Sequence, residues 1–251
     1  MKFNVDSKTF VSALNSVLLR GKYPSGSSYR MKSLSNYVYL IASNSGLQLC
    51  NADDTTACSL LLPQATIIEN GEVILDITKT VKYLKTFSNE ISVTVTDFIY
   101  VETDNKQASM SVVVSHPCYS MIEKIRKIKL PADGSMPSFG KLNIKFEARI
   151  TSDASSIIEA AMSCDAVGMV RYMFDYNGED YIISANQNGI EKISTNVSLI
   201  SHEGEEATVE IAGPFASFLD SITITYLKDE FPVLWVCPNR MLIKAPRIAG
   251  R

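Results

Sequence analysis

The chain has 251 residues, which suits one large domain or two medium ones, and 46% of them are hydrophobic, enough to bury a full core. No apolar run approaches the ~18 residues of a membrane helix and no basic-then-apolar leader opens the chain, so we expect an intracellular protein without a membrane span. Five scattered cysteines form no CxxC pair, which argues against a zinc knuckle and a disulfide framework.

The net charge of −3 is unevenly distributed along the chain. Residues 1–115 carry 10 basic and 10 acidic residues, residues 116–141 carry 5 and 2, and residues 142–251 carry 9 and 15. The three parts therefore have net charges of 0, +3 and −6. Because the whole chain is not a polycation, any contact with nucleic acid must depend on locally placed cations.

The first 115 residues predict many short strands and two short helices. A strand at 1–5 is followed by Asp6 or Ser7 as a helix N-cap, and the next helix has an apolar stripe. That stripe consists of Phe10, Leu14, Val17 and Leu18. Polar turns then separate strands predicted at 37–42, 47–51, 57–62, 91–95, 98–102 and 107–114.

Residues 71–87 change from strand to helix periodicity. Apolar residues alternate up to Ile77 and then recur at helical spacing as far as Phe87. The opposite arc of the helix, roughly 120° wide, carries Lys79, Lys82 and Lys85. A solvated helix face is the simplest explanation for one such lysine cluster.

Residues 116–141 interrupt this pattern with three prolines, two glycines and the basic run 124–129, a composition typical of a linker. The simplest structure for that run is an extended, solvated segment that contacts the body of the protein on one side. Ile125 and Ile128 within it are apolar and would face that body.

After Leu142 the pattern of strands and helices begins again. It predicts a strand at 144–150, a cap at Thr151 or Ser152, and a helix at 152–163. The apolar stripe of that helix would be Ile157, Ile158, Ala161 and Met162. A hairpin at 169–185, a strand and helix within 208–222, and a final hairpin that turns at 238–240 complete the chain.

Three segments recur in the same order, which predicts an internal duplication. Residues 39–49 resemble 181–193, residues 71–87 resemble 208–222, and residues 91–101 resemble 233–243, with offsets near 142 for the first and third pairs. A period this long indicates duplicated domains. We therefore predict two similar α+β domains, 1–115 and 142–251, joined by an interdomain linker at 116–141.

Three motifs resemble the two-domain sliding clamps of DNA polymerases, the PCNA family. They are LQLCNADDTTACSL at 47–60, FPVLW at 231–235 and MLIKAPRI at 241–248. The resemblance implies duplicated processivity-fold (DNA clamp) domains, with antiparallel sheets outside and two short helices per domain lining a ring. Six domains close such a ring, so a two-domain chain implies a homotrimer. Edge strands at 109–114 and 193–199 would pair between subunits.

The function implied by the resemblance is that of a processivity factor in DNA replication and repair. It would encircle duplex DNA without reading sequence and tether DNA polymerase, the clamp loader and other proteins, in the cytoplasm or nucleoid, or in the nucleus of a eukaryote. Such a protein needs neither a cofactor nor a metal ion. Lysine suits the lining of the ring because its flexible point charge contacts phosphates without a base code.

The implied DNA-binding residues lie mainly in the first domain. They are Lys8, Arg20, Lys22, Lys79, Lys82 and Lys85. The helices expected at 152–163 and 214–222 contain no lysine or arginine and carry Asp153, Glu159 and Asp220, which departs from the family. Either Arg149 and other residues near the lining compensate for these missing cations, or DNA contacts mainly the first domain.

The resemblance also implies a surface pocket for the short hydrophobic peptides of partner proteins. Carried onto this chain, the pocket consists of Ala52, Ala57, Ile128, Leu130, Pro232, Ile243, Ala245 and Pro246. Ordinary core or edge packing is the alternative for each residue. The basic linker would favour acidic partner peptides.

An enzyme is not expected. His116 and His202 are far apart, and neither the nearby Cys118 nor Glu203 completes a set of metal ligands. P-loop, GxGxxG and GxSxG motifs are absent from the sequence. The alternative to a clamp is a β-rich interaction protein, or a clamp-like subunit of hetero-oligomers that does not encircle DNA by itself.

Overall fold

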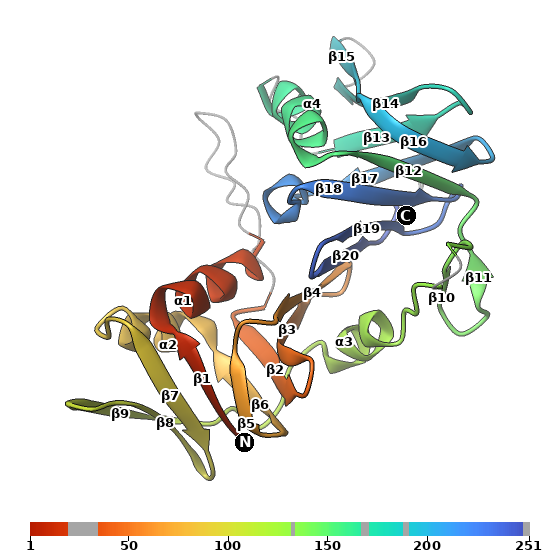
Figure 1. Cartoon of the computed structure of the whole chain (residues 1–251). Helices are drawn as coiled ribbons and strands as arrows, with labels where there is room; N and C mark the ends of the chain where they lie inside the picture. Colours follow the sequence, from red (N-terminus) through yellow and green to blue (C-terminus); the bar gives the residue numbers. More distant parts are fainter. Residues whose placement is uncertain (20–34, 132–133, 167–170, 188–190, 248–251) are drawn as a thin grey trace. The chain divides into compact units, whose positions relative to one another are not determined.

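The computed structural model in Figure 1 describes residues 1–19, 35–131, 134–166, 171–187 and 191–247. The described residues form two compact units, one up to Ile122 and the other from Glu123 onward. Among them, no helix is long and apolar enough to cross a membrane.

The first unit consists of two antiparallel sheets and two helices. One sheet has the order β5-β1-β7-β8-β9, and the other has the order β4-β3-β2-β6. The strands are β1 (Lys2–Asp6), β2 (Tyr37–Ser43), β3 (Gly46–Ala52), β4 (Thr56–Leu62), β5 (Thr66–Glu69), β6 (Gly71–Asp76), β7 (Glu90–Val95), β8 (Phe98–Thr103) and β9 (Lys106–Ser111). The helices are α1 (Ser7–Ser16) and α2 (Ile77–Leu84).

Both helices of the first unit begin directly after a strand that ends in aspartate. Asp6 accepts a 2.8 Å hydrogen bond from the backbone N–H of Thr9, and Asp76 accepts one of the same length from that of Lys79. Each carboxylate satisfies a backbone donor that the first helical turn leaves unpaired. The predicted apolar stripe is buried, because all four of its residues are at most 1% exposed, although Val17 and Leu18 follow the last residue of α1.

The second unit repeats this arrangement with the sheet orders β16-β12-β18-β19-β20 and β15-β14-β13-β17. Its strands are β10 (Ser138–Phe139), β11 (Ile144–Lys145), β12 (Ala148–Asp153), β13 (Arg171–Tyr176), β14 (Tyr181–Gln187), β15 (Glu191–Asn196), β16 (Leu199–Gly204), β17 (Ala207–Ala212), β18 (Ile222–Leu227), β19 (Val233–Cys237) and β20 (Arg240–Lys244). The helices are α4 (Ala154–Ala166) and a short 3-10 turn, η1 (Ala216–Phe218). Helix α3 (Tyr119–Arg126) precedes most of this unit in the sequence.

The two units match strand for strand, but two of the three sequence repeats align strands that are not equivalent in the two units. The order of strands in each sheet makes β2–β3 equivalent to β13–β14, whereas the repeat at 39–49 and 181–193 equates it with β14–β15. The repeat at 91–101 and 233–243 is displaced by one strand in the same way. Neighbouring antiparallel strands share the same alternation of side chains, so the pattern fits either partner. The third repeat correctly aligns equivalent elements of the two units, β6–α2 with β17–η1.

The helix predicted at 214–222 is wrong, because only the three residues of η1 are helical. Gly213 and Ser221 have left-handed φ angles of 84° and 49°, which leaves little room for a helix between them. Burial of Phe215 also determines this backbone. Its ring stacks on that of Trp235 at 5.0 Å between centroids and packs edge-on against that of Phe174 at 5.3 Å.

Three further expectations need correction. Met162 is 64% exposed, and the buried stripe of α4 includes Ala160 and Cys164 instead. The strand expected at 144–150 is interrupted between β11 and β12. The extended segment expected at 124–129 begins as the last turn of α3, because Ile122, Ile125 and Ile128 recur every three residues and are all buried.

Candidate nucleic-acid interface

The lysines of α2 and its C-cap, Lys85, form an exposed face on the first unit. Lys79, Lys82 and Lys85 are exposed, while Ile77 and Leu84 on the opposite side are completely buried. Lys79 Nζ lies 3.3 Å from Ser111 Oγ, and none of the three lysines forms an ion pair within the described part of the chain. The face therefore presents three solvated cations on a fixed backbone.

Helix α1 lies beside α2 in the first unit, as Figure 1 shows. Lys8 on α1 is exposed, so it adds a fourth cation to this pair of helices. Arg20 and Lys22, the other predicted cations of this unit, lie outside the described residues.

Lys106 fixes the end of α2, a role that the sequence did not reveal. Its ammonium donates a 2.6 Å hydrogen bond to the carbonyl of Thr86 and lies 4.8 Å from the centre of the Phe87 ring. A cation at the C-terminal end of a helix is favoured by the helix dipole. Lys106 follows Thr86 by 20 residues, so no local pattern indicates the contact.

Helix α4 presents a face without cations. Ser155, Glu159 and Met162 are exposed on it, and Asp153 caps it by accepting a 2.8 Å hydrogen bond from the backbone N–H of Ser155. A hydrogen bond from the Ser155 hydroxyl, together with the one from its backbone N–H, lowers the pKa of Asp153. The carboxylate is therefore charged at neutral pH, and this face is acidic where α2 is basic.

The structure does not place Arg149 on a helix face. Arg149 lies on β12 between Ala148 and Ile150, which are both fully buried, so its side chain points to the other side of the sheet. Its guanidinium donates to the Glu203 carboxylate and to the Gly134 carbonyl, both at 3.3 Å. These contacts engage the guanidinium, and a role for Arg149 as a compensating cation stays a prediction.

The residues predicted for the partner-peptide pocket fall in both units. Ala52 and Ala57 are cross-strand partners on β3 and β4 and are completely buried. Ile243 on β20 and Ile128 are also buried, whereas Leu130 is 41% exposed. Pro232, Ala245 and Pro246 are half-buried. Their assembly into one pocket stays a prediction.

His116 has a structural role at the start of the connector between the units. Its Nδ1 accepts a 3.0 Å hydrogen bond from the backbone N–H of Cys118, so Nε2 carries the proton. Nε2 lies 3.0 Å from the Tyr37 carbonyl and 3.2 Å from Asn51 Oδ1, which are both acceptors. Burial lowers the pKa of His116, so the ring is neutral at neutral pH. Both of its nitrogens are occupied by these structural contacts.

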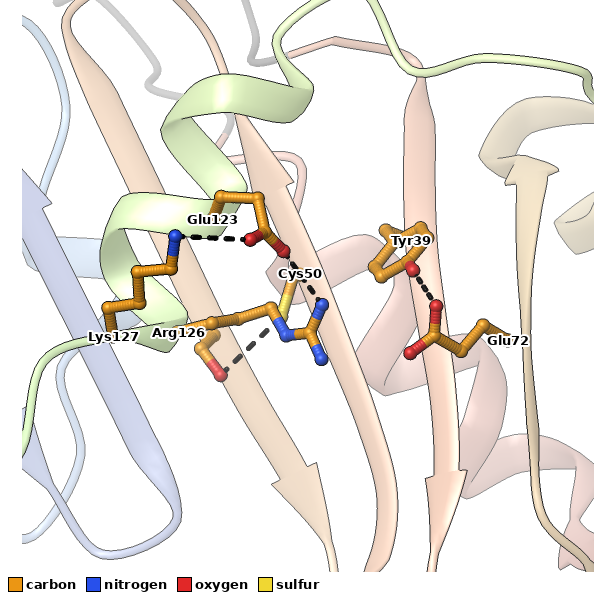
Figure 2. A network of polar contacts seen from close by, with 7 residues as sticks. Tyr39, Cys50, Glu72, Glu123, Arg126 and Lys127 are labelled. Atoms are coloured by element: carbon orange, nitrogen blue, oxygen red, sulfur yellow. Dashed lines mark hydrogen bonds and ion pairs between the residues drawn. The ribbon is translucent and has the colours of Figure 1, made fainter.

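Polar contacts around the connector are shown in Figure 2. On α3, Glu123 forms ion pairs with Arg126 at 3.0 Å and with Lys127 at 3.5 Å. In the first unit the Tyr39 hydroxyl donates to Glu72, as Figure 2 shows. The Tyr119 ring packs edge-on against the Tyr39 ring. Among the described residues, no group of three or more His, Cys, Asp and Glu side chains could hold a metal ion.

Comparison of the sequence with protein-family models and with curated proteins finds no match. The structure, however, is similar to solved sliding clamps. PCNA of A. fulgidus, solved with the C-terminal region of FEN-1, matches with a TM-score of 0.70 and 16% identity over 100% of this chain and 99% of that chain. A chain of the PCNA2–PCNA3 complex of Sulfolobus tokodaii matches at 0.69 and 13% over 98% and 99%.

The DNA polymerase III β subunit of Borrelia burgdorferi also matches, with a TM-score of 0.69 and 13% identity, but this chain covers only 63% of its length. The fold is therefore that of DNA sliding clamps. In its length and its two units, the chain is similar to the PCNA structures, and this confirms the predicted fold class.

Proposed function

We propose that this protein is a DNA sliding clamp, a ring that encircles duplex DNA and tethers a DNA polymerase to it. The main support is the match of the whole chain to PCNA structures, combined with the exposed lysine face of α2. In this proposal residues 1–115 and 142–251 are the two domains, and residues 116–141 connect them. Three chains close the ring.

The proposed DNA contact is electrostatic and independent of sequence. Lys8, Lys79, Lys82 and Lys85 are exposed on neighbouring helices, where flexible ammonium groups would exchange between phosphates as the ring slides. Arg20 and Lys22 remain proposed contacts on sequence grounds. The acidic face of α4 leads us to propose that DNA contacts mainly the helices of the first domain.

The proposed partners are DNA polymerase, the clamp loader and repair proteins that carry a clamp-binding peptide. The A. fulgidus PCNA was solved with the C-terminal region of FEN-1, which supports peptide recognition by this fold. Leu130 is the exposed apolar residue of the proposed pocket, so Leu130→Glu should abolish binding of such a peptide in calorimetry. Unchanged affinity would refute the placement of the pocket.

A second candidate is a clamp subunit that assembles with different subunits. The absence of cations from α4 favours it, since another subunit could supply them, and the S. tokodaii structure contains two different PCNA proteins. Light scattering distinguishes the two proposals. A homotrimer of the 27.7 kDa chain has a mass of three times that value, about 83 kDa. A stable monomer would contradict self-assembly and favour the second candidate.

A further inference from the structure

The core of the second unit contains a cluster of buried polar atoms without hydrogen-bond partners. The cluster consists of the Tyr181 hydroxyl on β14, Thr225 Oγ1 on β18 and Trp235 Nε1 on β19, which have no such partner in the part of the chain that the structure describes. All three residues are at most 1% exposed. Buried polar groups in native proteins are nearly always paired with protein atoms or with ordered water, so this cluster needs a physical explanation.

The three groups of the polar cluster meet between the two sheets of the second unit. Thr225 and Trp235 are cross-strand partners on neighbouring strands. Tyr181 belongs to the opposite sheet, where its ring stacks on the Phe174 ring at 6.3 Å between centroids. The same Phe174 ring packs edge-on against Trp235 at 5.5 Å. Burial raises the pKa of Tyr181 and a contact with Thr225 opposes that rise, so the two hydroxyls are neighbours.

The polar cluster does not satisfy its own hydrogen-bonding groups. Trp235 Nε1 can only donate, whereas the hydroxyls of Tyr181 and Thr225 can each donate and accept. In the described structure no two of these three groups are hydrogen-bonded to each other, although the two hydroxyls are neighbours. Polar groups that lie near each other without a direct hydrogen bond are commonly bridged by water. A ligand of the cluster must therefore accept from the indole and bond to both hydroxyls.

The chemistry of the polar cluster selects water over an ion or a larger molecule. All three side chains are neutral at neutral pH, and an indole N–H directed at the site disfavours a cation. The cluster offers no cationic side chain to an anion. Because its residues are at most 1% exposed, the cluster has no opening to solvent for a larger ligand. A water molecule has two donors and two acceptors, and a buried one typically makes about three hydrogen bonds.

We propose that a water molecule is bound between the two sheets of the second unit, where it accepts a hydrogen bond from Trp235 Nε1 and bridges the hydroxyls of Tyr181 and Thr225. This water links the two sheets, because Tyr181 lies on β14 of one sheet and its other two partners lie on β18 and β19 of the other. A water held in this way is part of the folded structure. The water site does not depend on a ring or on DNA.

The direct test is a crystal structure of the full chain at a resolution that shows ordered water. One density peak should lie about 2.7–3.2 Å from each of Trp235 Nε1, the Tyr181 hydroxyl and Thr225 Oγ1. Direct hydrogen bonds among the three groups without a peak between them, or apolar side chains that fill the space, would overturn the proposal.

A double-mutant cycle tests the same site in solution, with the unfolding equilibrium constant measured in urea. Tyr181→Phe and Thr225→Val each remove one hydroxyl with little change of shape, and each should raise that constant about fivefold. Because both hydroxyls share one water, the double variant should raise it by less than the product of the single effects, by a factor of at least about 3. Effects that simply multiply would contradict a shared ligand.

The matched control is Thr223→Val. Thr223 is fully buried two residues before Thr225 on β18, but its hydroxyl lies 3.3 Å from Cys237 Sγ and is not part of the polar cluster. Its effect should multiply with that of Tyr181→Phe within about twofold. Coupling to Thr223 as strong as that to Thr225 would show that the cycle reports general core packing. Because neither measurement uses DNA or a polymerase, failure would leave the clamp function untouched.

Discussion

Lys106 on β9 and Thr86 at the end of α2 are joined by a 2.6 Å hydrogen bond from the lysine ammonium to the threonine carbonyl. The same ammonium covers the Phe87 ring, so one side chain ties the edge strand of the first sheet to the helix that carries the lysine face. This contact holds the C-terminal end of α2 against β9.

We predict that Lys106→Met destabilises the first unit by about 1 kcal/mol, because it removes a charged hydrogen bond and a cation–π contact at an exposed site. Urea unfolding measures the change. Lys106→Arg is the matched control, since a guanidinium keeps the charge above the ring, and it should lose less stability. Equal losses for the two variants would show that the charge does not stabilise the end of the helix.

We predict that Lys79, Lys82 and Lys85 changed together to alanine weaken DNA binding and polymerase processivity but leave assembly intact. If each lysine contacts one phosphate, the slope of log affinity against log salt should fall by about 3 for each chain of the ring whose lysines contact DNA. The control K145A/R171A/K192A removes three exposed cations elsewhere and should behave like wild type. Unchanged processivity of the α2 variant at moderate salt would refute the assignment.

We predict that adding cations to α4 strengthens DNA binding if that helix faces the DNA. Glu159 and Met162 are exposed, so E159K/M162K should change stability by less than about 0.5 kcal/mol. Affinity for duplex DNA, measured as a function of salt, should rise relative to E159Q, which removes the acid without adding a cation. An affinity equal to that of E159Q would mean that α4 does not contact the DNA.

We predict that the stability of the first unit declines as the pH falls below about 6.5, the ordinary pKa of histidine. Burial lowers the pKa of His116, so between the two pKa values the unfolded chain binds more protons than the folded one, and acid favours unfolding. Above 6.5 the full contribution of the neutral ring is present. Below the folded pKa no further loss from His116 is expected.

Urea unfolding at pH 7.5 and pH 5.5 tests this, with His116→Gln as the comparison. Glutamine keeps hydrogen-bonding capacity without titrating, so the variant should be less stable at pH 7.5 but lose less than wild type on acidification. Parallel losses in the two proteins would assign the pH dependence to other groups.

The fold class was predictable because the helix signals in the first unit are local. Asp6 and Asp76 each cap the helix that follows, and the apolar spacing after each is helical and faces the core. The predicted repeat identified the duplication but aligned strands that are not equivalent. The strands β2–β3 and β14–β15 have the same alternation of apolar and polar side chains without occupying the same place in their sheets. Which strands of the two units are equivalent depends on how the strands pair, and strand pairing is not determined by local sequence.

The errors at η1 and α3 have different physical causes. In η1 the burial of Phe215 against Trp235 outweighs helix propensity, and sequence spacing carries no information on that contact. In α3 the signal was present, because Glu123 precedes Arg126 and Lys127 by three and four residues and Ile122 precedes Ile125 by three. The prolines and glycines of residues 116–141 led to the prediction of a linker in place of this helix.

The candidate DNA-binding residues were predictable only where they lie on a periodic helix. Lys79, Lys82 and Lys85 lie where the sequence placed them, exposed on α2. Arg149 was chosen without such a pattern, and its guanidinium donates to the Glu203 carboxylate, a contact that the sequence did not predict.

The most direct test of the clamp function is topological. The protein is loaded onto nicked circular DNA with its clamp loader and ATP, and the DNA is then separated from free protein by gel filtration in about 1 M salt, where the Debye length is about 3 Å and simple electrostatic binding is lost. A closed ring should stay on the circle and be released when a restriction enzyme makes the DNA linear. Release from the circle itself, or equal retention on circular and linear DNA, would contradict the proposal that this protein encircles DNA.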